Sequence, residues 1–292
     1  MIANRIEDTS TMSTARIYHN PDCGTSRNVL ALLRAAGIGP AVIEYLVTPP
    51  SRQTLRALIA DAGLTVRGAL RIKGTPYKDL GLDDAALSDD QLIDHMLRHP
   101  LLINRPFVVT ERGTRLCRPS DLALDLLPAD AAAELEKKEV KKEEGTPFLR
   151  DEPIAGDAPD FVAALLDAGL PIGDLAESNR TFYAYRTPAG RLAGYGGFER
   201  YADNALLRSI TVPPMNRGQG IGRNLLALLQ RRAYGLGARQ AWLLAGTAAP
   251  FFAQAGFKAV AREQAPQAIL ATRQAADLCP ANAALMKRTI AF

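Results

Sequence analysis

The chain has 292 residues, 47% of them hydrophobic and 23% charged, with a formal net charge of +4. This length is typical of two domains of about 100 to 150 residues. No apolar run approaches the roughly 18 residues that cross a bilayer, which predicts a soluble protein with no membrane role. The positive excess lies in residues 151–292, with 15 Lys and Arg against 11 Asp and Glu, but it is scattered and lacks interleaved aromatic residues. That pattern argues against nucleic-acid binding.

The opening segment and the cysteines indicate the compartment. "MIANRIEDTSTMSTAR" mixes charges of both signs and has no apolar core of a secretory signal, so we expect a disordered leader or an alternative start there. Three cysteines, Cys23, Cys117 and Cys279, make no disulfide framework and suit a reducing, cytoplasmic setting. No CxxC pair occurs and the histidines do not cluster with cysteines, so no metal site is predicted.

The first half has the pattern of a thioredoxin-like α/β domain. Short apolar runs predict strands at 15–20 and 41–46 on either side of a helix at 25–37, which Gly37 ends. Further helices are predicted at about 52–62, 64–72 and 89–98. They are followed by a hairpin at 107–118 and a closing helix at 120–127.

The second half of the sequence predicts a second domain with a different fold. "ADAAAELEKKEVKKEEG", residues 129–145, loses nearly all large apolar residues, so we predict a charged linker over 131–155 between domains at 15–130 and 156–292. A mixed sheet with flanking helices is predicted for the second domain. Its elements are a helix from about Asp160, strands at 181–187, 191–200, 204–212 and 240–245, and helices at 220–235 and 249–256.

The first candidate site is "HNPDCGTSRN", residues 19–28, in which Cys23 stands directly before a predicted helix. Backbone N–H groups and the helix dipole at such a position favour the reactive thiolate, and the same groups can bind an oxyanion beside the sulfur. Ser26 and Arg27 add donors to that turn. Because position 26 holds no second cysteine, oxidised Cys23 must be resolved by another thiol, from Cys117 or from outside the chain.

Four motifs make this half similar to a known family. "IYHNPDCGTSRN", "VRGALRIKG", "LLINRPFVVT" and "GTRLCRPSD" have the order and spacing of the glutaredoxin-dependent arsenate reductases, the ArsC family, over roughly residues 15–130. Guanidinium groups stay charged and offer forked donors that suit a tetrahedral oxyanion. The resemblance implies a catalytic cysteine, three oxyanion-binding arginines and a histidine beside the thiolate: Cys23; Arg71, Arg105 and Arg118; and His19. Ser26, from the donors of the turn described above, completes the predicted catalytic set.

The reaction implied by the resemblance is the reduction of arsenate to arsenite. Cys23 attacks As(V) and water leaves, glutathione adds, arsenite departs after reduction, and glutaredoxin resolves the mixed disulfide of Cys23 with glutathione. Glutathione is then the co-substrate and glutaredoxin the protein partner. A relative of the Spx/YffB type, a redox-responsive binding module of the same fold, is the alternative. The arginine-bearing motifs "NRP" and "RLCRP" argue against it.

The second candidate site is "RGQGIG", residues 217–222, between a predicted strand and an apolar helix. A glycine-rich turn in this setting cradles a pyrophosphate. The stretch is not GxGxxG, and no acidic ribose ligand follows about 20 residues later, which disfavours a Rossmann site. It resembles instead the Arg/Gln-x-x-Gly-x-Gly/Ala motif of GNAT acetyltransferases, with Arg217, Gly220 and Gly222 in register.

The resemblance to GNAT enzymes covers about 160–288. "GLPIGDL", "GGFERY", "ALLRSITV" and "TRQAADLCPANAALMK" resemble the arsenic-resistance N-acetyltransferase branch. The implied co-substrate is acetyl-CoA. Its pyrophosphate is expected on Arg217, Gly218, Gln219, Gly220, Ile221 and Gly222, and its pantetheine arm on the backbone of Ile210, Thr211 and Val212.

Catalysis in the second domain is less determined. Phe252 stands where many GNAT enzymes carry a tyrosine that acts as general acid, so an acid must come from elsewhere or the domain binds without turnover. Glu199 is the predicted base for an amine acceptor. Arg208 and Ser209 are secondary candidates for acceptor binding. The acceptor stays open among an organoarsenical, an amine and a peptide terminus.

The leading hypothesis is a two-domain arsenic-detoxification enzyme that joins an arsenate reductase to an N-acetyltransferase. A second hypothesis makes the first domain a redox-responsive binding module and the second a non-catalytic binder of acetyl-CoA. A third leaves only the second domain active, on a small amine.

Overall fold

The computed structural model describes residues 15–279 and 282–291, so the predicted leader lies outside them apart from Ala15 and Arg16. The described chain forms two compact units. The first holds the residues up to Cys117 together with Leu122–Glu134, and the second holds Arg118–Asp121 and the chain from Leu135 onward. The domain boundaries given above stay a prediction.

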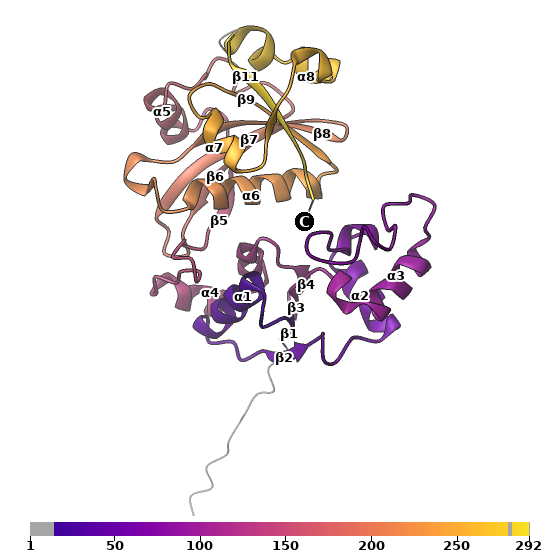
Figure 1. Cartoon of the computed structure of the whole chain (residues 1–292). Coiled ribbons are helices and arrows are strands. Elements are labelled where there is room, and N and C mark those ends of the chain that lie inside the picture. The colour runs from indigo at the N-terminus through magenta and orange to yellow at the C-terminus, as the bar shows by residue number, and fades with distance from the viewer. Residues whose placement is uncertain (1–14, 280–281, 292) are drawn as a thin grey trace, which may run out of the picture. The chain divides into compact units, whose positions relative to one another are not determined.

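The first unit is built on a four-stranded sheet in the order β2-β1-β3-β4 (Figure 1). β1 pairs with β2 in parallel and with β3 antiparallel, and β3 and β4 form the predicted hairpin. This is the expected thioredoxin-like arrangement, which confirms the predicted fold class. The elements are β1 (Arg16–His19), α1 (Gly24–Ala35), β2 (Ala41–Glu44), α2 (Arg52–Asp61), α3 (Asp89–Arg98), β3 (Phe107–Thr110), β4 (Gly113–Leu116) and α4 (Ala129–Glu136).

Local sequence signals explain where two helices of this unit begin. Ser51 caps α2 by accepting the Thr54 N–H, and Ser88 forms a capping box with Gln91 at the start of α3. Both helices lie where they were predicted. Their apolar residues, among them Leu55, join a core with Tyr45 and Phe107.

Two helix predictions in the first unit were wrong. Only a 3-10 turn, Arg67–Ala69, forms within 64–72, because Leu70 leaves the turn to make an antiparallel bridge with Ile103. Residues 120–127 likewise form a 3-10 helix, Ser120–Leu126, instead of an α-helix. A tertiary pairing of the backbone has outweighed helical periodicity in the first case.

The second unit is a mixed seven-stranded sheet in the order β10-β11-β9-β8-β7-β6-β5. All neighbouring strands are antiparallel except β8 and β9, which are parallel. The elements are β5 (Arg150–Ile154), α5 (Pro159–Asp167), β6 (Arg180–Arg186), β7 (Leu192–Tyr201), β8 (Asn204–Thr211), α6 (Ile221–Gly235), β9 (Gln240–Ala245), α7 (Ala249–Gln254), β10 (Lys258–Ala259), α8 (Gln267–Leu270) and β11 (Ala284–Thr289).

Helices α5 and α6 cover opposite faces of this sheet. The ring of Phe161 of α5 packs tilted by 48° against that of Phe182 of β6, with the ring centroids 4.9 Å apart. On the other face a Cβ at Gly196 of β7 would meet the side chains of Leu225 and Leu229 of α6 at 3.1 and 3.4 Å. The glycine therefore lets α6 approach the sheet closely, and the predicted mixed sheet with flanking helices is confirmed (Figure 1).

The segment predicted as a charged linker contains regular structure. α4 runs to Glu136, and β5 pairs along its whole length with β6 as an edge strand of the sheet. Backbone pairing needs no apolar pattern, and Glu152 and Pro153 suit an exposed edge. Within 15–279 and 282–291 no helix is long and apolar enough to span a membrane.

Candidate functional site

Cys23 lies at the end of the loop that connects β1 to α1. It occupies the N-cap position of α1, with an extended backbone (φ −103°, ψ 111°), and no acidic residue stands in the first turn. Its N–H donates to the Asn20 carbonyl at 3.1 Å, and its own carbonyl accepts the Arg27 N–H at 3.0 Å. The half-buried thiol is free of any disulfide. The helix N-terminus thus supplies donors and a favourable dipole beside the sulfur.

His19 and Ser26 lie buried on either side of this loop. His19 is 5% exposed and pairs in register with Glu44 of β2. Burial lowers the pKa of His19 below its usual 6.5, although Glu44 opposes the shift, so the imidazole is neutral at pH 7. Among the described residues, neither the His19 Nδ1 nor the fully buried Ser26 Oγ has a hydrogen-bond partner. Both atoms are therefore available to a ligand.

Two of the three predicted arginines come from segments that a backbone hydrogen bond joins. The Arg71 N–H donates to the Leu102 carbonyl at 2.8 Å, which ties the "RIKG" segment to the stretch that leads into Arg105. Arg105 is 6% exposed, and its Nη1 donates to the Leu101 carbonyl at 3.3 Å. Arg71, Arg105 and Cys23 all act electrostatically on the hydroxyl of the buried Tyr45.

The third predicted arginine, Arg118, falls in the second unit. Its Nη1 is buried and has no hydrogen-bond partner in the described part of the chain. Its membership of the Cys23 site stays a prediction. Cys117, beside it, is fully buried in the hairpin, as expected of a packing residue.

Sequence reasoning missed Tyr45, Asn20 and Asn104 in this region. Asn20 and Asn104 lie within the quoted motifs without a role assigned to them, and Tyr45 lies in none of the motifs. The available signal was topological: Asn20 and Tyr45 lie at or near the carboxyl ends of the two predicted strands, where sites in parallel sheets form.

In the second unit the glycine-rich turn adopts the backbone expected of a phosphate cradle. Gly218 and Gly220 have φ of 77° and 76°, and α6 begins at Ile221 directly after them. The Arg217 Nε donates to the Val212 carbonyl and the Gln219 Nε2 to the Met215 carbonyl, both at 3.0 Å. These bonds hold the turn while the first N–H groups of a 15-residue helix face out of it. The residues present fit a pyrophosphate.

The strand before this turn separates from its neighbour. β8 pairs with β9 only over Asn204–Leu206, and no ladder joins the rest of β8 to β9 in the described chain. Ser209 has φ of 53° at the point where the pairing of β7 with β8 shifts register. The backbone of Ile210 and Thr211 therefore lies beside an opening between parallel strands, where an extended ligand arm can pair with it.

Glu199 lies in a buried ionic cluster. It is fully buried on β7, accepts the Tyr201 hydroxyl at 2.6 Å and pairs with Arg208 of β8. Arg208 also donates to Asp174, and Arg180 reaches both Asp174 at 2.9 Å and Glu199 at 3.5 Å. Burial, with the hydrogen bond to Glu199, raises the pKa of Tyr201 to about 12.

Phe252, at the position of the missing tyrosine, is buried on α7. Its ring makes edge contacts with Phe251 and Phe257, with centroids 5.1 and 5.9 Å apart. It packs the helix against the strand that follows and offers no proton.

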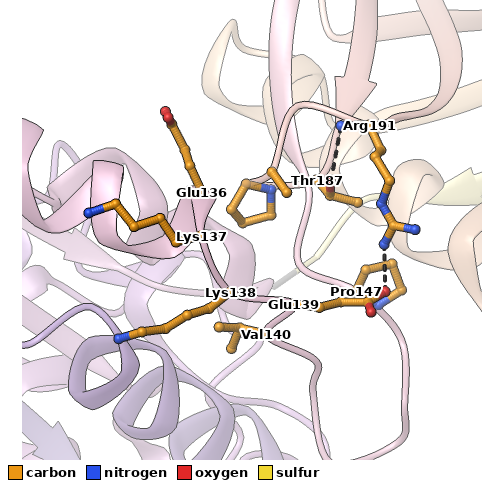
Figure 2. Close-up of a pocket in the computed structure, with 10 residues that line it drawn as sticks. Glu136, Lys137, Lys138, Glu139, Val140, Pro147, Thr187 and Arg191 are labelled. Carbon is orange, nitrogen blue, oxygen red and sulfur yellow. Dashed lines mark hydrogen bonds and ion pairs between the residues drawn. The ribbon is translucent and has the colours of Figure 1, made fainter.

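None of these residues lines the pocket of about 240 Å³ that Figure 2 shows in the second unit. The charged stretch after α4 and the turn between β6 and β7 line it, and Arg191 pairs across it with Glu139 at 2.5 Å. Both side chains are more than half exposed, so this pair contributes little stability. Within the described ranges no group of acidic, cysteine or histidine residues is arranged to hold a metal ion.

The geometry defines a thioredoxin-like unit with a cysteine at the N-terminus of a helix, followed by an acetyltransferase-type sheet. A profile of the ArsC family matches residues 18–126, and a profile of the GNAT acetyltransferase domain matches residues 177–259. An arsenate reductase of Rhizobium meliloti is 59% identical over 136 residues, 47% of this chain and 94% of the relative. One from Escherichia coli K12 is 53% identical over 134 residues, 46% and 92%. The chain therefore belongs to the ArsC family and carries a GNAT domain.

Solved structures similar to each half include two that differ widely in identity. An arsenate reductase from Vibrio cholerae shares 47% identity with a TM-score of 0.38, covering 39% of this chain and 97% of that chain. An N-acetylglutamate synthase from Neisseria gonorrhoeae, complexed with coenzyme A and N-acetyl-glutamate, shares 20% identity with a TM-score of 0.41, covering 50% and 36%.

Proposed function

We propose that the first unit reduces arsenate to arsenite with glutathione and glutaredoxin, in the cytoplasm. The observation that carries this is the half-buried Cys23 at the N-terminus of α1, with Arg71 and Arg105 on two segments joined by the hydrogen bond from the Arg71 N–H to the Leu102 carbonyl. The identity of 59% to an arsenate reductase over nearly its whole length supports it.

In the proposed reaction the Cys23 thiolate attacks As(V), so that an S–As bond forms, one As–O bond breaks and the oxygen leaves as water. The helix N-terminus and the guanidiniums of Arg71 and Arg105 hold the negative charge of the oxyanion, and Arg118 is proposed to join them. Two thiols then supply two electrons: arsenic departs as arsenite, and Cys23 is left in a mixed disulfide with glutathione. Glutaredoxin reduces that disulfide and restores the thiol.

The test is NADPH consumption coupled through glutathione reductase, with glutathione and glutaredoxin, on addition of arsenate. The wild type is expected to consume NADPH and Cys23→Ser to lose that activity entirely. Cys279→Ser, which removes a thiol from the other unit, is the matched control and is expected to keep it. If the wild type consumes no NADPH on addition of arsenate, the reductase proposal is wrong and the redox-responsive binding module is favoured.

We further propose that the second unit is an acetyl-CoA-dependent N-acetyltransferase, so that the chain joins two activities in arsenic detoxification. The turn of residues 217–222 would hold the pyrophosphate, and the backbone of Ile210, Thr211 and Val212 the pantetheine arm. Glu199 stays the predicted base, with its acceptor an unidentified small molecule.

Acetyl-CoA binding tests this second part, with two glycines as a matched pair. Gly220 and Gly190 have φ of 76° and 78°, so alanine strains both backbones alike. A Cβ at Gly220 would also meet the Thr146 Oγ1 at 2.4 Å, whereas Gly190 faces open space. Calorimetry is expected to show acetyl-CoA affinity at least tenfold lower in Gly220→Ala and unchanged in Gly190→Ala. Equal affinity in all three proteins would contradict the assigned turn.

A further inference from the structure

Tyr45 stands beside the loop that carries Cys23, although no motif includes it. The parallel register pairs His19 of β1 with Glu44 of β2, so the next residues, Asn20 and Tyr45, leave the same end of the sheet side by side. Asn20 begins the loop and accepts the Cys23 N–H through its carbonyl.

The segments that carry the two arginines meet Tyr45 from the other side. The Tyr45 hydroxyl donates to the Ile103 carbonyl at 3.4 Å, and Ile103 forms the bridge to Leu70, the residue before Arg71. Arg105 follows two residues after Ile103. The hydroxyl therefore lies where the Cys23 loop and both arginine segments converge, and its long bond to a carbonyl leaves it able to turn to a better acceptor.

Polar atoms around this point lack partners. Tyr45 is only 1% exposed and Asn104 is fully buried. In the described part of the chain, the Asn104 Nδ2 and the Arg105 Nε are buried without a hydrogen-bond partner, as are the His19 Nδ1 and the Ser26 Oγ. Buried polar groups of this kind are costly unless a ligand or water satisfies them. Donors predominate, which fits a ligand made of oxygen acceptors.

We propose that the Tyr45 hydroxyl donates the proton to the oxygen that leaves arsenic when Cys23 attacks. The proposal rests on the reductase function proposed above. The S–As bond forms as an As–O bond breaks, and the departing hydroxide takes the hydroxyl proton of Tyr45 and leaves as water. The phenolate, next to the guanidiniums of Arg71 and Arg105, takes a proton back from solvent before the next turnover.

The electrostatics of the site support this assignment. Burial raises the pKa of Tyr45 above its usual 10.0, and the nearby Cys23 adds to the shift, while Arg105 and Arg71 oppose it. The phenol therefore keeps its proton at neutral pH until the reaction needs it. The two guanidiniums stabilise the phenolate once it forms, which is the balance that a general acid requires.

Tyr45→Phe tests the proposal because it removes one oxygen and keeps the buried ring. The kcat/KM for arsenate is expected to fall roughly 100-fold, the range typical of a lost general acid. Binding should change little: the arsenate concentration that half-protects Cys23 from alkylation by iodoacetamide is expected to stay within threefold of the wild type. Tyr77→Phe is the matched control, since Tyr77 belongs to the same core at 9% exposure, and it is expected to behave as the wild type.

A second variant separates a chemical role from a structural one. Fluorotyrosine placed at position 45 has a more acidic phenol and the same shape, so the alkaline limb of the pH profile for kcat/KM is expected to move to lower pH. An unmoved limb, or a Tyr45→Phe enzyme with wild-type kcat/KM, would overturn the role of Tyr45 and leave the reductase proposal standing. A wild type without arsenate turnover overturns both.

Discussion

The Cys23 site and the Glu199 cluster are both buried and polar, yet they differ in how their charged groups are paired. Around Cys23, atoms such as the Arg105 Nε and the Ser26 Oγ have no partner within the described residues. In the cluster, Arg208 holds two carboxylates, and Glu199 is bound by Arg208 and Tyr201. The Arg180 and Arg208 Nε atoms of the cluster also lack a hydrogen-bond partner within the described residues, so the difference lies in the ion pairs: Asp174 and Glu199 are each paired with arginines of the same unit. Removing one member of such a buried set leaves an uncompensated charge, whatever further role Glu199 has as the predicted base.

The largest expected effect is on the cluster. Arg208→Met would leave Asp174 and Glu199 buried without their shared cation, since the Arg208 side chain is 1% exposed. The free energy of unfolding of the second unit is expected to fall by about 3–5 kcal/mol. Denaturant unfolding followed by the fluorescence of Trp242, the single tryptophan of the chain, measures this unit alone.

The matched control for that variant is Arg273→Met, which breaks the pair with Glu177. Both partners are more than 40% exposed, so the expected loss is below about 1 kcal/mol. If the two variants unfold at the same denaturant concentration, the buried cluster does not stabilise the second unit more than the exposed pair does.

At the Cys23 site the next largest effect is expected on activity, not on stability. Arg105→Ala removes a buried guanidinium that donates to the Leu101 carbonyl, so kcat/KM for arsenate is expected to fall about 10- to 100-fold, as for a lost hydrogen bond to a charged group. Coupled NADPH consumption measures it. Arg98→Ala, a helix-surface arginine bound to the Asp94 carbonyl, should retain full activity.

The smallest effect expected is in the dependence of stability on pH. Burial lowers the pKa of His19 below 6.5 in the folded chain, so the unfolded chain binds more protons as pH falls below 6.5. Stability of the first unit is therefore lost from about pH 6.5 downward, by at most about 1.4 kcal/mol per pH unit. His19→Gln should flatten the change in urea midpoint between pH 7 and pH 5.

The second unit should respond in a different pH range. Burial by itself would raise the pKa of Asp174, but the hydrogen bonds and charges of Arg208 and Arg180 outweigh it and hold the pKa below 3.8. Its contribution is present above pH 3.8 and is lost only as pH falls further. The test measures the urea midpoint of the second unit by Trp242 fluorescence at pH 7 and pH 5. A midpoint that is lower at pH 5 in the wild type, but the same at both pH values in Asp174→Asn, would contradict this.

Much of the fold was readable from local sequence. Ser51 and Ser88 are N-cap residues at the starts of α2 and α3, and Arg112 and Gly113 lie at the turn of the β3–β4 hairpin. Arg71 was placed on a helix because its neighbours have helical spacing, and that was wrong. Its backbone instead donates to Leu102, a partner 31 positions away that no local pattern reveals.

The sequence by itself determined the parts whose chemistry is local: a cysteine before a helix, and glycines at the two positive-φ positions of the 217–222 turn. Only the tertiary structure decided which distant groups surround them. The register of β1 with β2 sets Tyr45 beside the Cys23 loop, and the pairing of β6, β7 and β8 buries Glu199 among arginines. Such neighbours depend on strand pairing between residues far apart in the chain, and a one-residue change of register would exchange the faces of the sheet.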